Sequence, residues 1–140
     1  MITYVDTSTL IKLIVDEVGS ERAELIWYSA DSLASVRLIV VEAHAALAAA
    51  ARDKRLSVNQ LRLAKTELAA FLDDLHVVEV TEELIERAAQ LAEVESLRAY
   101  DAVHLAAALF VSAEVLTSAD RTLCEAAGRQ GLHVADPLMI

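Results

Sequence analysis

Short apolar segments with strand character alternate with helical segments along the chain, and this alternation constrains the fold more than any other feature. Consecutive parallel strands need a crossover connection, which is usually a helix. The alternation therefore predicts an α/β fold: a central, mainly parallel sheet with helices on both faces, in a single domain of residues 1–140. Strands are expected at residues 2–6, 32–36, 76–80, 114–117 and 132–135.

The helical segments carry their own start signals. Ser57 and Thr81 are good N-cap residues, and Thr81 is followed by two acids that suit the first turn of a helix. The alanine-rich stretch at residues 43–51 has high intrinsic helix propensity. Helices are expected at residues 7–14, from residue 20 past Trp27, and at residues 38–54, 57–74, 81–94, 101–111 and 120–129.

Four acidic residues stand at the ends of different expected elements. Asp6 closes the first strand, and Asp120 follows the fourth. In an open α/β sheet, ligand sites lie beyond the carboxyl ends of the strands, so these two acids are expected at the functional edge. Glu42 lies in the helix at 38–54, and Asp101 opens the helix at 101–111. Both would have to face the same crevice.

Four converging carboxylates would repel one another and raise each other's pKa unless a divalent cation balanced them. Hard oxygen ligands suit Mg²⁺ or Mn²⁺, which bind phosphate and activate a water nucleophile. The pattern therefore indicates metal-dependent phosphodiester chemistry. Taken singly, Asp6, Asp101 and Asp120 could each cap a helix, and Glu42 could be a surface residue. One shared metal site accounts for all four.

The charge balance restricts the partners of the chain. A formal net charge of −10 disfavours non-specific binding to nucleic acid, because such binding needs clustered Lys and Arg. It also suits a basic partner protein. Five basic residues nevertheless fall together around one expected helix–helix turn. They are either a solvated helix end or a rim that holds a polynucleotide near the acidic pocket: Arg52, Lys54, Arg55, Arg62 and Lys65.

Two further residue types admit ordinary explanations. The single cysteine, Cys124, cannot form an internal disulfide and is expected to pack in a helix. His104 follows Asp101 by three residues, so both occupy one helix face. A packed or hydrogen-bonded His104 is favoured over a general base. The sequence has no targeting segment and no stretch long enough to span a membrane, so a cytoplasmic location without membrane contact is expected.

Four segments in order resemble the PIN domain, and more narrowly the VapC-type toxins of type II toxin–antitoxin pairs. They are residues 4–10, 41–42, 97–106 and 116–123. The resemblance implies a PIN-like three-layer α/β/α sandwich and Mg²⁺- or Mn²⁺-dependent endoribonuclease activity on cellular RNA. It also implies a homodimer and a small cognate antitoxin, for which we expect a basic C-terminal segment. Residues 57–71 and the helix that carries Trp27 are expected at the dimer interface.

Carried over residue by residue, the resemblance assigns the catalytic and metal-binding roles to four acids. Asp6 and Asp101 match the direct metal ligands, whereas Glu42 and Asp120 act directly or through water. Supporting hydroxyls match at Thr7, Ser8 and Ser118. Some relatives have a further acid just after the fourth. Here Arg121, Thr122 and Leu123 follow, which weakens the case for a second metal ion.

Other functions are compatible with an acid at the end of the first strand. A haloacid-dehalogenase-like phosphatase needs a second Asp two residues later, where this chain has Ser8. A receiver-type Mg²⁺-binding module needs an acidic pair at or before Asp6, where Tyr4 and Val5 stand. A housekeeping nuclease and a catalytically idle PIN-like binding protein remain as alternatives within the same fold.

Overall fold

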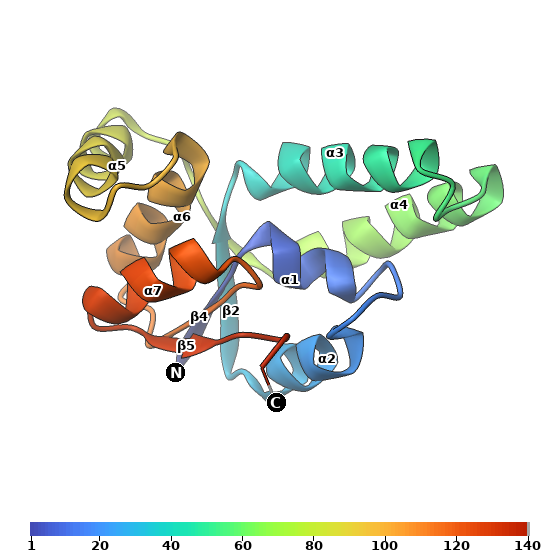
Figure 1. Ribbon diagram of the computed structural model, residues 1–140, viewed down its shortest axis with the longest axis horizontal. Coiled ribbons are helices and arrows are strands. Elements are labelled where there is room, and N and C mark those ends of the chain that lie inside the picture. The colour runs from blue at the N-terminus through green and yellow to red at the C-terminus, as the bar shows by residue number, and fades with distance from the viewer. Residues whose placement is uncertain (140) are drawn as a thin grey trace.

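The structure is a computed structural model that describes residues 1–139, and its centre is a five-stranded sheet (Figure 1). Every neighbouring pair of strands is parallel, in the order β3-β2-β1-β4-β5. The predicted parallel sheet is confirmed. A receiver-type module has the order 2-1-3-4-5, so the topology excludes that alternative. The strands are β1 (Ile2–Val5), β2 (Ser32–Val36), β3 (His76–Val78), β4 (Val115–Thr117) and β5 (His133–Ala135).

Helices cover both faces of the sheet, which confirms the three-layer sandwich (Figure 1). On one face, α1 to α4 pack on Val5 and enclose Leu10, Ile39 and Leu47. On the other face, α5, α6 and α7 pack on Tyr4 and Leu116. The described residues form α1 (Thr7–Lys12), α2 (Ser20–Ser29), α3 (Ile39–Arg52), α4 (Val58–Asp73), α5 (Glu82–Glu95), α6 (Ala99–Phe110) and α7 (Arg121–Arg129).

The two central strands bring the first and fourth acids to one edge of the sheet. Tyr4 pairs with Leu116 and Val5 with Thr117. The amide N–H of Asp6 then donates to the carbonyl of Thr117 over 2.9 Å, so the pairing continues one residue beyond β1. Parallel strands in this register end together, and the residues that follow them must therefore share the same edge.

Helix α6 begins two residues earlier than expected. Its N-cap is Arg98, in an extended conformation, and the helix starts at Ala99. Asp101 therefore lies in the first turn instead of opening the helix, and the prediction was wrong on this point. The physical reason is that an extended Arg98 suffices to start the helix, with no side-chain cap. The first-turn position still points an acid towards the positive end of the helix dipole.

A compact hairpin joins α3 and α4. The amide of Arg55 donates to the carbonyl of Ala50, and that of Lys54 donates to Ala51, which is a Schellman motif. Lys54 adopts a left-handed φ of 62°, where glycine is the usual residue. Ser57 then caps α4 in a reciprocal capping box with Gln60. The predicted helix start at Ser57 is thus confirmed, and α3 ends two residues before Lys54.

The segments proposed for a dimer interface divide between core and surface. Trp27 is buried and packs edge-on against the half-buried Phe71, with ring centroids 5.2 Å apart, so the Trp27 ring belongs to the core. The exposed apolar residues on the same two helices are Leu25 and Tyr28 on α2, and Val58 and Leu63 on α4. The homodimer itself stays a prediction. Among residues 1–139, no helix combines the length and apolar character needed to span a bilayer.

Candidate active site

Asp6 is buried at the edge of the sheet, directly after β1. It stands at the N-cap position of α1, but its carboxylate makes no capping bond to the backbone. Instead, Oδ2 accepts hydrogen bonds from the hydroxyls of Ser8 and Ser118, each over 2.7 Å. Helix capping therefore does not explain the acid at this position. Two hydroxyl donors hold the carboxylate in one orientation.

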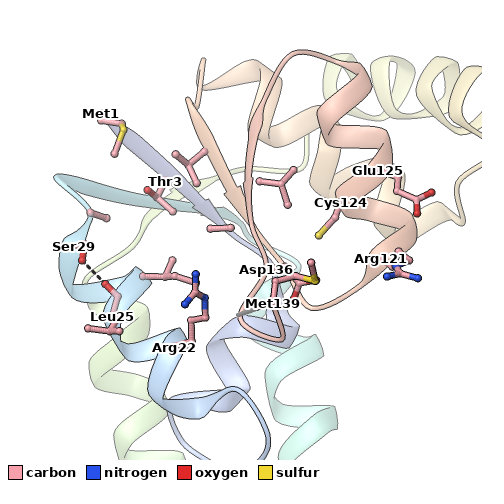
Figure 2. A pocket seen from close by; sticks show the side chains of 15 residues that line it. Met1, Thr3, Arg22, Leu25, Ser29, Arg121, Cys124, Glu125, Asp136 and Met139 are labelled. Atoms are coloured by element: carbon pink, nitrogen blue, oxygen red, sulfur yellow. Dashed lines mark hydrogen bonds between the residues drawn. The ribbon is translucent and has the colours of Figure 1, made fainter.

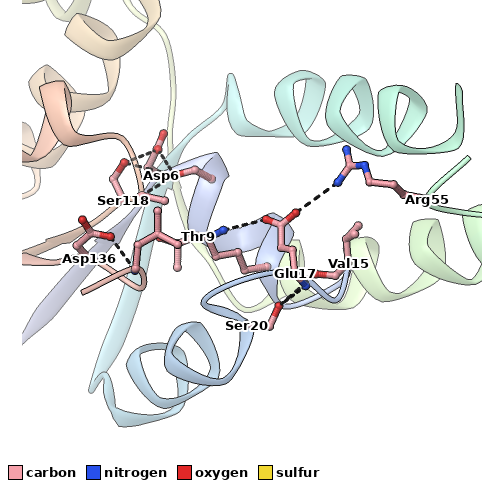
Figure 3. A network of polar contacts seen from close by, with 12 residues as sticks. Asp6, Thr9, Val15, Glu17, Ser20, Arg55, Ser118 and Asp136 are labelled. Carbon is pink, nitrogen blue, oxygen red and sulfur yellow. Dashed lines mark hydrogen bonds and ion pairs between the residues drawn. The ribbon is translucent and has the colours of Figure 1, made fainter. Parts of the chain in front are cut away.

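The two serines also join the ends of β1 and β4. The amide of Ala119 donates to Ser8 Oγ over 2.9 Å, and the amide of Asp120 donates to Ser118 Oγ over 3.0 Å. Figure 3 shows Ser118 reaching the Asp6 carboxylate from the neighbouring strand. Both hydroxyls were predicted as supporting residues, and both contact the first acid.

Glu42 lies in the first turn of α3 and is held by two side chains. Thr7 Oγ1 donates to Glu42 Oε1 over 2.9 Å, and His104 Nε2 lies 2.7 Å from the same oxygen. The other ring contact of His104 Nε2 is Asp6 Oδ1, at 3.4 Å. A single imidazole nitrogen therefore contacts two of the four acids, one just after β1 and one on α3. Glu42 is not a solvated surface residue.

His104 is fully buried on α6, and its opposite nitrogen contacts the core. Nδ1 lies 2.8 Å from the hydroxyl of Tyr4 on β1. Burial alone would lower the pKa of His104, but the Glu42 hydrogen bond and the charges of Asp6, Glu42 and Asp101 outweigh it and raise the pKa. Nε2 donates to Glu42, whose carboxylate can only accept, while Nδ1 contacts the Tyr4 hydroxyl, which can donate or accept. The preference for a hydrogen-bonded His104 is confirmed.

Asp101 and Asp120 approach the same region from two helices. Burial raises the pKa of the Asp101 carboxyl, and the charges of Asp120 and Asp6 raise it further. Asp6 and Asp120 therefore lie close enough to Asp101 for their charges to act on its carboxyl. Asp120 caps α7, because its Oδ1 accepts from the amides of Thr122 and Leu123 over 2.9 and 3.3 Å. Asp120 is therefore a helix cap, as one of the sequence interpretations proposed. The capping bonds engage only Oδ1 of its two carboxylate oxygens.

The donor set has the chemistry of a magnesium or manganese site. Within residues 1–139, no group of three or more His, Cys, Asp or Glu side chains is arranged to hold a metal ion by itself. Mg²⁺, however, is usually bound through one or two carboxylates and keeps several waters. Among the described residues, Glu42 Oε2, both Asp101 oxygens and Asp120 Oδ2 accept no hydrogen bond. These hard oxygens fit a partly hydrated divalent ion.

A cavity of about 760 Å³ lies elsewhere, between α2, the β4–β5 side of the sheet and α7 (Figure 2). None of the four acids lines it, but Arg121, Cys124 and Asp136 do. Burial and the charges of Asp136 and the site acids raise the pKa of Cys124 to about 12. The thiol donates to the carbonyl of Ser118. Cys124 is therefore a packed thiol, as predicted, and not a nucleophile.

Sequence reasoning missed two features of the site. The contact of Tyr4 with His104 could not be predicted from the sequence, because a tyrosine in an apolar strand usually packs in the hydrophobic core. Asp136 directly follows β5 at the same edge of the sheet as Asp6 and Asp120. The signal that singled out Asp6, an acid just after a strand, was also present there. Asp136 accepts from the amide of Leu138 and so closes a turn.

Residues 3–129 match the family model described as the PIN domain. The chain belongs to this family. It is 39% identical over 136 residues to Ribonuclease VapC45 of Mycobacterium tuberculosis (strain CDC 1551 / Oshkosh), a match that covers 96% of this chain and 94% of the relative. The resemblance to PIN-domain ribonucleases of the VapC type is therefore confirmed.

Solved structures share the fold. The FitAcB structure from Neisseria gonorrhoeae matches with a TM-score of 0.76 and 18% identity, covering 100% of both chains. A toxin–antitoxin complex from Klebsiella pneumoniae matches with a TM-score of 0.68 and 21% identity, covering 99% of both chains. At these identities the likeness extends to the three-layer arrangement of sheet and helices.

Proposed function

We propose that this chain is a divalent-metal-dependent endoribonuclease and the toxin component of a type II toxin–antitoxin pair. The observation that carries the proposal is the shared contact of His104 with Asp6 and Glu42, which supports a functional grouping of acids from separate elements. The ribonuclease name of a relative that is 39% identical over nearly the whole chain supports RNA as the substrate.

The proposed division of labour is the one that the family resemblance implies. Asp6 and Asp101 would hold the metal ion, and Glu42 and Asp120 would act on it directly or through water. When bound, such an ion neutralises charge on the scissile phosphate and lowers the pKa of a water. Ser8 and Ser118 orient Asp6, whereas Thr7 and His104 orient Glu42. Each carboxylate then presents its remaining oxygen without having to reorganise.

The purified protein is expected to cleave single-stranded RNA in Mg²⁺ or Mn²⁺ and to lose this activity in excess chelator. The physical reason is that, without the cation, clustered carboxylates repel the phosphate they must bind. Gel analysis of a labelled RNA with and without EDTA, followed by addition of Mn²⁺, is the measurement. Undiminished cleavage in chelator would contradict the metal requirement. Binding of RNA without cleavage would favour the idle binding protein.

We further propose a small partner whose basic C-terminal segment lies across the four acids. An arginine side chain can replace the cation there through paired guanidinium–carboxylate hydrogen bonds. The formal charge of −10 would speed encounter with such a segment. Solved structures with the same fold include toxin–antitoxin complexes, such as the one from Klebsiella pneumoniae.

We expect this partner to be encoded by a small gene next to the gene of this chain. Expression of this chain alone is expected to arrest growth, and co-expression of the partner is expected to restore it. Colony counts after induction are the measurement. An Asp101→Asn variant expressed to the same level serves as the control, since it should be harmless with or without the neighbour. If the wild-type chain is also harmless while the purified protein still cuts RNA, the toxin role fails and a housekeeping nuclease is the better description.

A further inference from the structure

The charge of this chain is divided very unevenly. Residues 52–65 contain five of the 12 basic residues and one of the 22 acidic residues. The remainder of the chain, with seven basic and 21 acidic residues, therefore carries a formal charge of −14. All five basic side chains are exposed, and we call this surface the basic tip: Arg52, Lys54, Arg55, Arg62 and Lys65.

The hairpin between α3 and α4 presents these charges together. Arg52 ends α3, Lys54 and Arg55 form the turn, and Arg62 and Lys65 lie three residues apart on one face of α4. In the described part of the chain, only Arg55 of the basic tip forms an ion pair, with Glu17 at 3.4 Å. Glu17 also pairs with Lys12 at 3.0 Å, so its charge is shared (Figure 3). The basic tip therefore keeps most of its positive charge.

Helix α3 connects the basic tip to the acids. Glu42 lies in its first turn and Arg52 at its last residue. Ten residues of α-helix span about 15 Å, which corresponds to about four nucleotides at the 3.4 Å rise of a stacked strand. In Figure 1, α3 and α4 extend together away from the sheet, and α3 starts near its centre. A strand that crosses the acids can therefore reach the basic tip after a few nucleotides.

We propose that the basic tip binds the sugar–phosphate backbone of the RNA substrate a few nucleotides away from the bond that is cut. The inference rests on the proposed ribonuclease function and identifies where the polyanion is held. Elsewhere the acidic surface repels RNA, so the basic tip supplies the favourable contact that lets a negatively charged enzyme bind a negatively charged strand. Such contacts position the substrate and carry no sequence information.

The first test removes two charges from the basic tip. Arg62→Ala/Lys65→Ala is compared with Arg22→Ala/Arg87→Ala, a control that removes two exposed arginines outside the basic tip. Binding of a labelled single-stranded RNA is followed by fluorescence anisotropy in excess chelator, between about 50 and 200 mM salt. The slope of log affinity against log salt is negative, and each lost phosphate contact makes it less steep by about 0.7, hence by about 1.4 for two. The control should keep the wild-type slope.

The second test separates charge from folding. Lys54→Gly removes a charge from the basic tip and places glycine at a left-handed φ, so it should raise the unfolding midpoint while weakening RNA binding. In cleavage assays, both tip variants should raise KM and leave kcat unchanged. A loss of binding caused merely by unfolding would lower the midpoint instead, and that result would overturn the proposal.

The outcomes keep this inference separate from the ribonuclease proposal. RNA binding through the basic tip without any cleavage would defeat the proposed activity and leave the inference standing. Cleavage with an unchanged KM and salt slope in both tip variants would defeat the inference and leave the activity standing. An equal loss of RNA affinity in the tip and control variants would show a general charge effect. If the tip variants bound RNA normally but no longer bound an acidic protein partner, the surface would be assigned to that partner. Either result would overturn the proposal.

Discussion

Asp6→Asn and Asp101→Asn should each lower kcat/KM for RNA cleavage by about 100- to 1000-fold, which corresponds to several kcal/mol of transition-state stabilisation. Each substitution keeps the shape of the side chain and removes the negative charge that a divalent cation needs. The measurement is cleavage of a labelled RNA at saturating Mn²⁺. Mn²⁺ affinity, measured by calorimetry, should fall in parallel.

The same variants should not unfold the protein. The pKa of Asp101 is raised in the fold, so its ionised form is destabilising at neutral pH when no cation is present. Asp101→Asn is therefore expected to raise the melting temperature in chelator while it removes activity. Asp73→Asn, at an exposed position of α4, is the matched control and should change neither property. Wild-type cleavage by both site variants would show that the four acids have another role.

The sequence predicted the layers of this fold because its signals are local. An acid directly after an apolar strand, as at Asp6, and capping residues such as Ser57 and Thr81 depend on a few neighbouring residues. The positions of the strands were accordingly correct within two residues. The boundary of α6 was less predictable, because Arg98 starts that helix by its backbone conformation, without any side-chain signal.

The sequence singled out the four acids as candidates, but it could not predict the contacts around them. Asp6 and Glu42 are joined through His104, which lies 98 positions after Asp6 and 62 after Glu42 in the chain. A fourth residue, Tyr4, contacts the opposite nitrogen of the imidazole. The packing of α6 on the sheet beside β2, and of α3 against α1, brings these residues together, and no local spacing encodes it.

His104 supplies the second large expected effect. His104→Ala removes one of the two partners of Glu42 and the contact of the buried Tyr4 hydroxyl with the imidazole, which should cost about 1–3 kcal/mol of unfolding free energy. Residues that orient metal-binding carboxylates usually contribute about 10- to 100-fold to metal affinity or activity. We therefore expect losses of that size in Mn²⁺ affinity and in kcat/KM. Denaturant unfolding, calorimetry and RNA cleavage are the measurements.

Two milder variants distinguish a positioning role from a structural one. Tyr4→Phe removes only the hydroxyl behind the imidazole and keeps the His104–Glu42 contact, so it should lower stability more than it lowers Mn²⁺ affinity. His104→Gln provides a neutral amide that can still donate to Glu42, and it should recover part of the lost affinity without the positive charge. If His104→Ala binds Mn²⁺ and cleaves RNA like the wild type, the imidazole serves only to fill the core. If affinity follows the Glu42 contact through the series, His104 holds that carboxylate in place for the reaction.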